Sequence, residues 1–161
     1  MEVKKCNECE TTLDAAEKNH KKCLEYLVAN GISDGSLTWH PVTTCAATTR
    51  GYREILEYCV ENGCPWDPET TYAAAVRGYK ELLEYCLENG CPCHPKMVHI
   101  AASFNQTEIL EYIFENCGDF ISWEDSKLEE HMGGYIEEIQ EYLLSIKEEW
   151  CSNSRSKYIK G

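Results

Sequence analysis

WDPETTYAAAVRGYKELLEYCLENGCP, residues 66–92, is the stretch that decides the fold, because the sequences on both sides of it repeat it. The 27 residues before it, 39–65, read WHPVTTCAATTRGYREILEYCVENGCP. The 27 residues after it, 93–119, read CHPKMVHIAASFNQTEILEYIFENCGD. Repetition at a fixed period of this kind is typical of proteins in which each repeat packs only against its neighbours. The sequence therefore predicts a stack of similar units.

The repetition extends weakly in both directions. LDAAEKNHKKCLEYLVANG, residues 13–31, aligns with residues 45–63 at an offset of 32, and YIEEIQEYLL, residues 135–144, aligns with TEILEYIF at an offset of 30. Terminal repeats are expected to be atypical, because one side of each faces water. We therefore predict one domain over residues 1–150 with a basic tail over 151–161. Its expected parts are repeats at about 10–38, 39–65, 66–92 and 93–119 and a degenerate cap at 120–150.

Each repeat is predicted to form two short helices. Asp67, Pro68 and Glu69 are typical of a helix start, since they offer a side-chain acceptor, a proline where no N–H is needed and an acid in the first turn. The first helix is expected to end at Gly78, a residue that readily adopts a left-handed conformation. The equivalent positions of the other repeats also hold residues that tolerate this conformation: Asn19, Gly51 and Asn105.

The second helix is expected from about Tyr79 to Glu88 and ends at Asn89 and Gly90. Its apolar residues fall on one helical stripe: Leu82, Leu83, Cys86 and Leu87. Because every repeat reads as two helices, the fold class predicted for the chain is all-α.

This pattern resembles the ankyrin repeat. The shared features are a first helix that ends in paired alanines, two variable residues and a glycine, followed by a second helix such as EILEYCVENG. Ankyrin repeats are about 33 residues long and carry a β-hairpin between units, whereas the connection GCPWDP is too short for one. The chain therefore looks like the short-form ankyrin-like repeats of protists and large DNA viruses. The resemblance covers residues 10–120 well and 121–148 loosely, and it implies a helical solenoid of about five helix pairs.

The resemblance also implies a function. In ankyrin proteins the two residues before the glycine that ends the first helix face a concave groove and vary with the partner. Carried onto this sequence, the partner-binding residues are Glu17, Lys18, Thr49, Arg50, Val76, Arg77, Ser103 and Phe104. We therefore expect a monomeric, non-catalytic module that binds another protein.

Composition narrows the kind of partner. The 161 residues carry a formal charge of −13 at pH 7, which argues against a surface that binds nucleic acid, because such surfaces depend on clustered Lys and Arg. A basic or mixed-charge protein partner is expected instead. No apolar run approaches the roughly 18 residues of a membrane span, and residues 1–10 lack the apolar core of a signal peptide. We expect no membrane association and an intracellular, cytoplasmic or nuclear, location.

Two ladders of residues recur along the second helices. A row of glutamates is expected to form a solvated acidic ridge, and a row of tyrosines beside it is expected to be half-buried, with an apolar body inside and a polar tip outside. The glutamates are Glu25, Glu57, Glu84, Glu111 and Glu141, and the tyrosines are Tyr26, Tyr58, Tyr85, Tyr112 and Tyr142.

The 11 cysteines raise the question of a metal site. Five of them replace Leu or Ile of other repeats and are therefore predicted to be buried core residues: Cys23, Cys59, Cys64, Cys86 and Cys91. Cys6 and Cys9 form a CxxC that suits zinc, and His40 and Cys45 are the further ligands considered for it. A second alternative is a cluster of Cys64, Cys91, Cys93 and His94. The favoured interpretation has no metal and no cofactor.

Catalytic motifs are absent from the sequence. It has no GxSxG, no GxxxxGK, no GxGxxG after a strand and no HExxH. The least favoured alternative is an enzyme with a cysteine nucleophile and His99 or His131 as its base. We expect that the protein is not an enzyme.

Overall fold

The computed structural model describes residues 8–32, 35, 38–94, 96–117, 141–146 and 148. The chain divides into two compact units, Met1–His94 and Pro95–Gly161. Within the described residues all regular structure is helical, which confirms the predicted all-α class. The predicted cap at 120–150 and tail at 151–161 fall almost wholly outside the described residues, where only 141–146 and 148 are helical.

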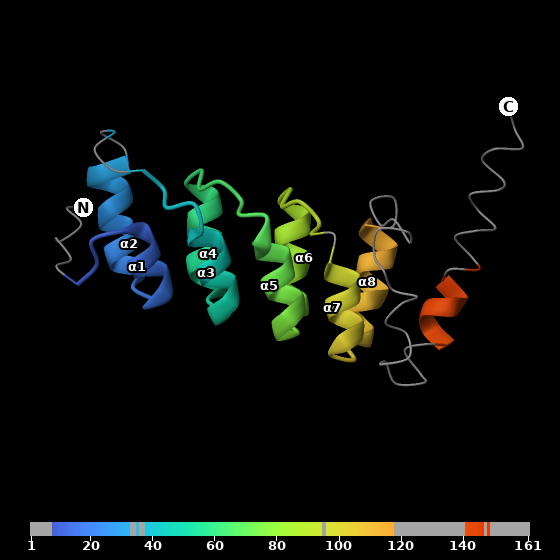
Figure 1. Cartoon of the computed structure of the whole chain (residues 1–161). Coiled ribbons are helices and arrows are strands. Elements are labelled where there is room, and N and C mark those ends of the chain that lie inside the picture. The colour runs from blue at the N-terminus through green and yellow to red at the C-terminus, as the bar shows by residue number, and fades with distance from the viewer. Residues whose placement is uncertain are drawn as a thin grey trace, which may run out of the picture. The chain divides into compact units, whose positions relative to one another are not determined.

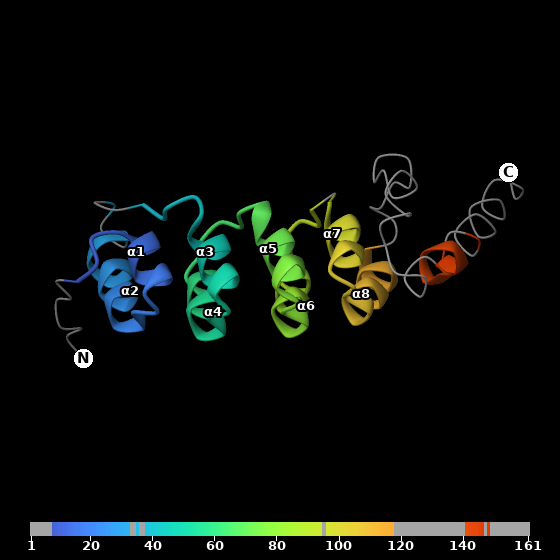
Figure 2. The ribbon, with the colours of Figure 1, turned by 60° about the horizontal axis from the view of Figure 1, so that its bottom comes forward.

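The first compact unit contains three pairs of helices (Figure 1). Its helices are α1 (Thr12–Glu17), α2 (Lys21–Leu27), the π-helix η1 (Val28–Ile32), α3 (Thr43–Arg50), α4 (Arg53–Glu61), α5 (Glu69–Arg77) and α6 (Lys80–Glu88). Contacts join the two helices of each pair, and they also join α1 to α3 and α3 to α5. In Figure 2, α1, α3 and α5 form one layer and α2, α4 and α6 the other. Among its described residues the second compact unit contains one further pair, α7 (Met97–Ser103) and α8 (Thr107–Cys117), and the helical residues 141–146 and 148.

The turn inside each pair has one geometry throughout. Gly78 is left-handed, with φ of 72°; its N–H donates to the carbonyl of Ala75, and the N–H of Tyr79 donates to that of Ala74. This double hydrogen bond is a Schellman motif, which satisfies the last carbonyls of a helix. The equivalent residues Asn19, Gly51 and Asn105 also have positive φ, so the predicted left-handed helix ends are confirmed.

The same motif ends α4 and α6 and brings pairs of cysteines together. The Cys64 N–H donates to the Cys59 carbonyl at 2.9 Å, and the Cys91 N–H donates to the Cys86 carbonyl at 2.9 Å. A hydrogen bond with the Cys64 thiol, followed by burial, raises the pKa of Cys59, and Cys86 raises that of Cys91 in the same way. Cys59 and Cys91 therefore stay protonated as they pack on the cysteine that follows or precedes them in the pair.

The core consists of small and aliphatic side chains, and the cysteines take part in it. All five cysteines predicted to be core residues are buried, which confirms that prediction. The tyrosines at the five ladder positions are all half-buried, as expected. Burial raises the pKa of Tyr142 in the second compact unit to about 12, with a further contribution from Glu111.

Buried threonines join one pair of helices to the beginning of the next repeat. The hydroxyl of Thr12 accepts the His40 N–H at 2.9 Å, and the hydroxyl of Thr44 accepts the Asp67 N–H at 3.0 Å. The contact recurs where the Thr71 hydroxyl accepts the N–H of His94. The carboxylate of Asp67 in turn accepts the Glu69 N–H at 2.7 Å, which is the side-chain acceptor that the sequence predicts at this helix start. The N-cap position itself is held by Pro68, one residue later than predicted. These bonds set the spacing between the helix pairs of the first compact unit.

Candidate functional site

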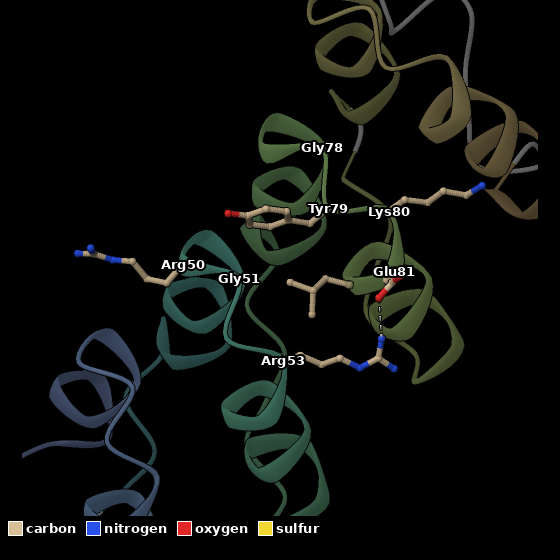
Figure 3. A pocket seen from close by; sticks show the side chains of 8 residues that line it. Arg50, Gly51, Arg53, Gly78, Tyr79, Lys80 and Glu81 are labelled. Carbon is tan, nitrogen blue, oxygen red and sulfur yellow. Dashed lines mark ion pairs between the residues drawn. The ribbon is translucent and has the colours of Figure 1, made fainter.

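A groove lies where the turns of the second and third helix pairs meet (Figure 3). It has a volume of about 480 Å³ and is lined by Arg50, Gly51, Arg53, Gly78, Tyr79, Lys80, Glu81 and Leu82. These residues come from the end of α3, the turn after it and the start of α4, and from the turn between α5 and α6 and the first residues of α6. The Schellman turns of two neighbouring repeats therefore create the groove, since each turn contributes its glycine and the second turn also contributes Tyr79.

Gly51 and Tyr79 make the closest approach in this groove. Gly51 has φ of 75°, and a Cβ atom built on it would lie 3.1 Å from Cζ of Tyr79. A side chain at position 51 would therefore be strained by its backbone conformation and would also press on the tyrosine ring. The tyrosine ring thus packs directly on the backbone of the preceding turn and forms one wall of the groove.

Cations outnumber acids around this groove. Arg53 pairs with Glu57 at 2.7 Å and Glu81 at 3.7 Å, and its guanidinium lies over the ring of Tyr85. The hydrogen bond with Glu57 raises the pKa of Arg53, so its charge is held in place. Arg50 and Lys80 extend to opposite sides of the groove (Figure 3). The groove is locally basic on a chain whose formal charge is −13.

Of the predicted partner-binding residues in the first compact unit, Arg50 lines the groove. The Thr49 hydroxyl donates to the Cys45 carbonyl at 2.8 Å, and the Lys18 ammonium donates to the Glu8 carbonyl at 3.0 Å. Glu17 and Arg77 are exposed, and Val76 is half-buried. Tyr79 and Lys80 also line the groove, and neither was among the predicted partner-binding residues. The sequence did offer a signal for a basic site here, because a cation follows Gly-Tyr in two successive repeats of an acidic chain, as Arg53 and Lys80.

In the second compact unit the two predicted residues differ in character. The Ser103 hydroxyl donates to the His99 carbonyl at 2.8 Å, whereas the Phe104 ring is 55% exposed. Exposed aromatic side chains are enriched at protein interfaces. The assignment of Ser103 and Phe104 to a partner surface remains a prediction.

A second cluster of reactive side chains lies at the first helix pair. Sγ of Cys9 is 3.4 Å from Nδ1 of His20, and Sγ of Cys23 is 4.0 Å from the same nitrogen. All three ligand atoms lie within 4.8 Å of one another. Cys9 and Cys23 are buried, and the Cys23 sulfur is disulfide-bonded. Burial raises the pKa of Cys9, and nearby Lys18 partly offsets this.

The first metal alternative added His40 and Cys45 to Cys6 and Cys9, and the described residues do not bring His40 and Cys45 to Cys9. Among the described side chains the cluster contains His20 and Cys23, and neither His40 nor Cys45 belongs to it. Cys23 was assigned to the core alone because it aligns with Ile and Leu. The signal that was missed is the HxxC spacing of His20 and Cys23, on the carboxyl side of CxxC.

The second metal alternative, which joined Cys64, Cys91, Cys93 and His94, is not borne out within the described residues. These four do not converge there as a group of ligand atoms. Nε2 of His94 instead lies 3.3 Å from Glu69, and its ring meets that of Tyr72 edge-on at 5.0 Å. Cys91 packs with Cys86. The side chains of His94 and Cys91 therefore contact neighbouring residues of the fold and do not form a shared metal site there.

Comparisons with protein-family models, with curated proteins and with solved structures found no match to this chain. Among the described residues, no helix combines the length and apolar character that crossing a membrane requires.

Proposed function

We propose that the protein is a non-catalytic module that binds another protein, and that its helix pairs form an ankyrin-like solenoid. The observation that carries the proposal is the groove at Gly51 and Tyr79, which is formed by two successive turns of the repeat. Repeat stacks bind partners on surfaces to which several units contribute. The threonine hydrogen bonds hold this surface in shape before binding, so little ordering entropy is lost on association.

The thiols support the non-catalytic part of the proposal. A cysteine nucleophile reacts as a thiolate and needs a lowered pKa. Burial raises the pKa of Cys9 and Cys45, and the paired thiols raise those of Cys59 and Cys91. These four cysteines are thus held in their unreactive form. Of the two histidines considered as a base, His131 lies outside the described residues.

The proposed partner presents an acidic side chain to the groove within a surface of mixed charge. Arg50, Arg53 and Lys80 offer a local positive field, and Arg53 is fixed by two glutamates. The overall charge of −13 attracts basic regions of a partner at longer range. The basic groove therefore favours an acidic side chain at the point of contact, whereas the acidic chain as a whole attracts a basic partner from a distance. A partner of mixed charge satisfies both.

Selection of a displayed random-peptide library on the full chain tests this proposal. Enrichment of sequences with an acidic residue next to a small or aliphatic one is expected. The affinity of the selected peptide, measured by fluorescence anisotropy, should fall roughly fivefold or more in Arg50→Ala and in Tyr79→Ala, because buried Arg and Tyr side chains dominate interface energies. Lys22→Ala is the matched control, since Lys22 is an exposed lysine on α2 that does not line the groove. Equal affinities in all three variants would show that the groove does not bind the peptide.

A further inference from the structure

We propose that Cys9, His20 and Cys23 bind a zinc ion when their thiols are reduced. Sulfur and imidazole nitrogen are the ligands that structural zinc sites use. The proposal is independent of the function proposed above, because it rests on a different part of the first compact unit.

The spacing of the three atoms fits a tetrahedral ion. Zinc binds sulfur at about 2.3 Å and nitrogen at about 2.0 to 2.1 Å, so neighbouring ligands of a tetrahedral site lie roughly 3.5 to 3.8 Å apart. Nδ1 of His20 lies 3.4 Å from Sγ of Cys9 and 4.0 Å from Sγ of Cys23. No two of the three atoms are more than 4.8 Å apart. Side-chain adjustments of less than about 1 Å would therefore bring all three into coordination.

The other repeats show that packing does not require these residues. The position of Cys23 is occupied by Ile55, Leu82 and Ile109 in the other repeats. His20 aligns with Tyr52, Tyr79 and Gln106. A core role alone would be met by Ile or Leu at position 23, yet in the first repeat a cysteine and a histidine occur together and face Cys9. This coincidence of ligand types at one place indicates coordination.

The local backbone holds the cluster in place. The His20 N–H donates to the Ala15 carbonyl at 2.9 Å, as part of the turn that ends α1. On the other side, Oδ2 of Asp14 accepts the N–H groups of Glu10 and Thr11, both at 3.3 Å. Hydrogen bonds therefore fix both segments that carry the ligands, so little ordering is needed to bind an ion.

One existing contact must change when the ion binds. Nδ1 of His20 lies 3.4 Å from Oε2 of Glu8. The Glu8 side chain is 72% exposed, and it can turn to solvent at small cost because exposed ion pairs contribute little to stability. Nδ1 faces both sulfurs and is therefore the nitrogen that coordinates.

Zinc binding and the disulfide of Cys23 exclude one another. A disulfide sulfur carries no thiolate, and thiolate is the form that binds zinc. A dithiol reductant gives up two electrons and two protons to the disulfide, which leaves two thiols here and a disulfide in the reductant. Binding of zinc then releases the thiol protons to solvent. The site is thus available to metal only in the reduced protein.

The proposed site consists of the three described side chains. Cys6, which precedes Cys9 in the CxxC of the sequence, lies outside the described residues.

The test uses tag-free full-length protein, reduced and freed of metal, titrated with zinc against a chromophoric chelator and separately with cobalt(II). One equivalent of zinc should bind, and cobalt(II) should give the intense visible absorption of a tetrahedral thiolate site. Cys9→Ser and Cys23→Ser remove a ligand atom each. Each should weaken zinc binding by more than the roughly 10–100-fold caused by losing a supporting residue that does not itself bind the metal. His20→Gln serves as a mild variant if a serine variant does not fold.

Cys45→Ser and His94→Gln are matched controls and should bind zinc as the unaltered protein does, because neither residue belongs to the cluster. Zinc should also raise the melting temperature of the reduced protein, since a ligand that binds only the folded state stabilises it. The proposal is overturned if the reduced protein binds no zinc, or if Cys9→Ser, Cys23→Ser and His20→Gln all bind it unchanged. Equal binding by the oxidised protein would overturn it as well.

Discussion

At the scale of single residues, glycine and asparagine at the helix ends decide where each pair turns. Gly51, Gly63, Gly78 and Gly90 all have φ between 72° and 81°, in a region that costs other L-residues about 1–2 kcal/mol. Their surroundings differ, because a Cβ at Gly51 would meet the ring of Tyr79 whereas nothing lies within 4 Å of one at Gly63. Gly51 is therefore constrained by conformation and by packing, and Gly63 by conformation alone.

Gly51→Ala is therefore expected to be more destabilising than Gly63→Ala. Gly63→Ala should lower the free energy of unfolding by about 1–2 kcal/mol, and Gly51→Ala should lower it further because the Tyr79 ring must move. Urea unfolding of both variants measures this difference. In a Tyr79→Ala background the extra cost of Gly51→Ala should disappear. Equal costs in the unaltered protein would contradict the packing argument.

At the scale of helices and their connections, the sequence predicted the secondary structure better than the contacts between repeats. Helical spacing and turn residues are local signals, so the helices and the left-handed turns could be predicted from the repeat. The buried hydrogen bond from Asp67 to Thr44 joins residues 23 positions apart, and no local pattern encodes it. A threonine on a helix is also compatible with an exposed position, so its burial could be learned only from the structure.

Thr44→Val should destabilise the protein by about 1–3 kcal/mol, because it leaves the buried N–H of Asp67 without its acceptor. It also removes the partner of the Thr70 hydroxyl, which lies 3.1 Å from the Thr44 hydroxyl. Thr48→Val is the matched control. Thr48 is fully buried on the same helix, and within the described part of the chain its hydroxyl has no hydrogen-bond partner.

The control variant should therefore be neutral or slightly stabilising, since it removes a buried hydroxyl that makes no bond. Chemical denaturation of the two variants under the same conditions gives the comparison. If Thr48→Val cost as much as Thr44→Val, the loss would come from valine in this helix and not from the hydrogen bond to Asp67.

The threonine contact also changes along the chain. In the fourth repeat the position of Thr44 and Thr71 is taken by Val98, which is buried in the second compact unit. Valine has no hydroxyl, so the same bond cannot be made from this position. The similarity between repeats weakens after residue 119. The threonine is lost one repeat earlier, within residues 93–119.

At the scale of the whole molecule, the candidate sites show what a repeat alignment can and cannot reveal. The resemblance to ankyrin repeats predicted Arg50 as a binding residue, and Arg50 lines the groove. Tyr79 was not among the predicted binding residues, although it lines the groove, and alignment with Ile and Leu of the other repeats placed Cys23 in the core. Alignment of the repeats cannot identify a residue that recurs in the repeat and also lines a site, because its role depends on the side chains that face it in the folded protein.

The net charge of −13 also acts on the whole molecule. Like charges repel one another in the compact state, whereas the ion pairs of the described residues are mostly exposed and contribute at most about 1 kcal/mol each. Repulsion should therefore outweigh attraction. Raising sodium chloride from about 0.02 M to about 0.5 M shortens the Debye length from about 20 Å to about 4 Å, and the melting temperature of the protein should rise.

Neutralising exposed acids gives the matched experiment. Glu61→Gln and Glu88→Gln together change two exposed glutamates at the ends of α4 and α6 and reduce the net charge from −13 to −11. This variant should melt higher than the unaltered protein at low salt, and the difference should vanish at high salt because screening removes the repulsion. A melting temperature that falls as salt is added would mean that the ion pairs across the helices, such as Lys21 with Glu54, dominate the electrostatic free energy instead.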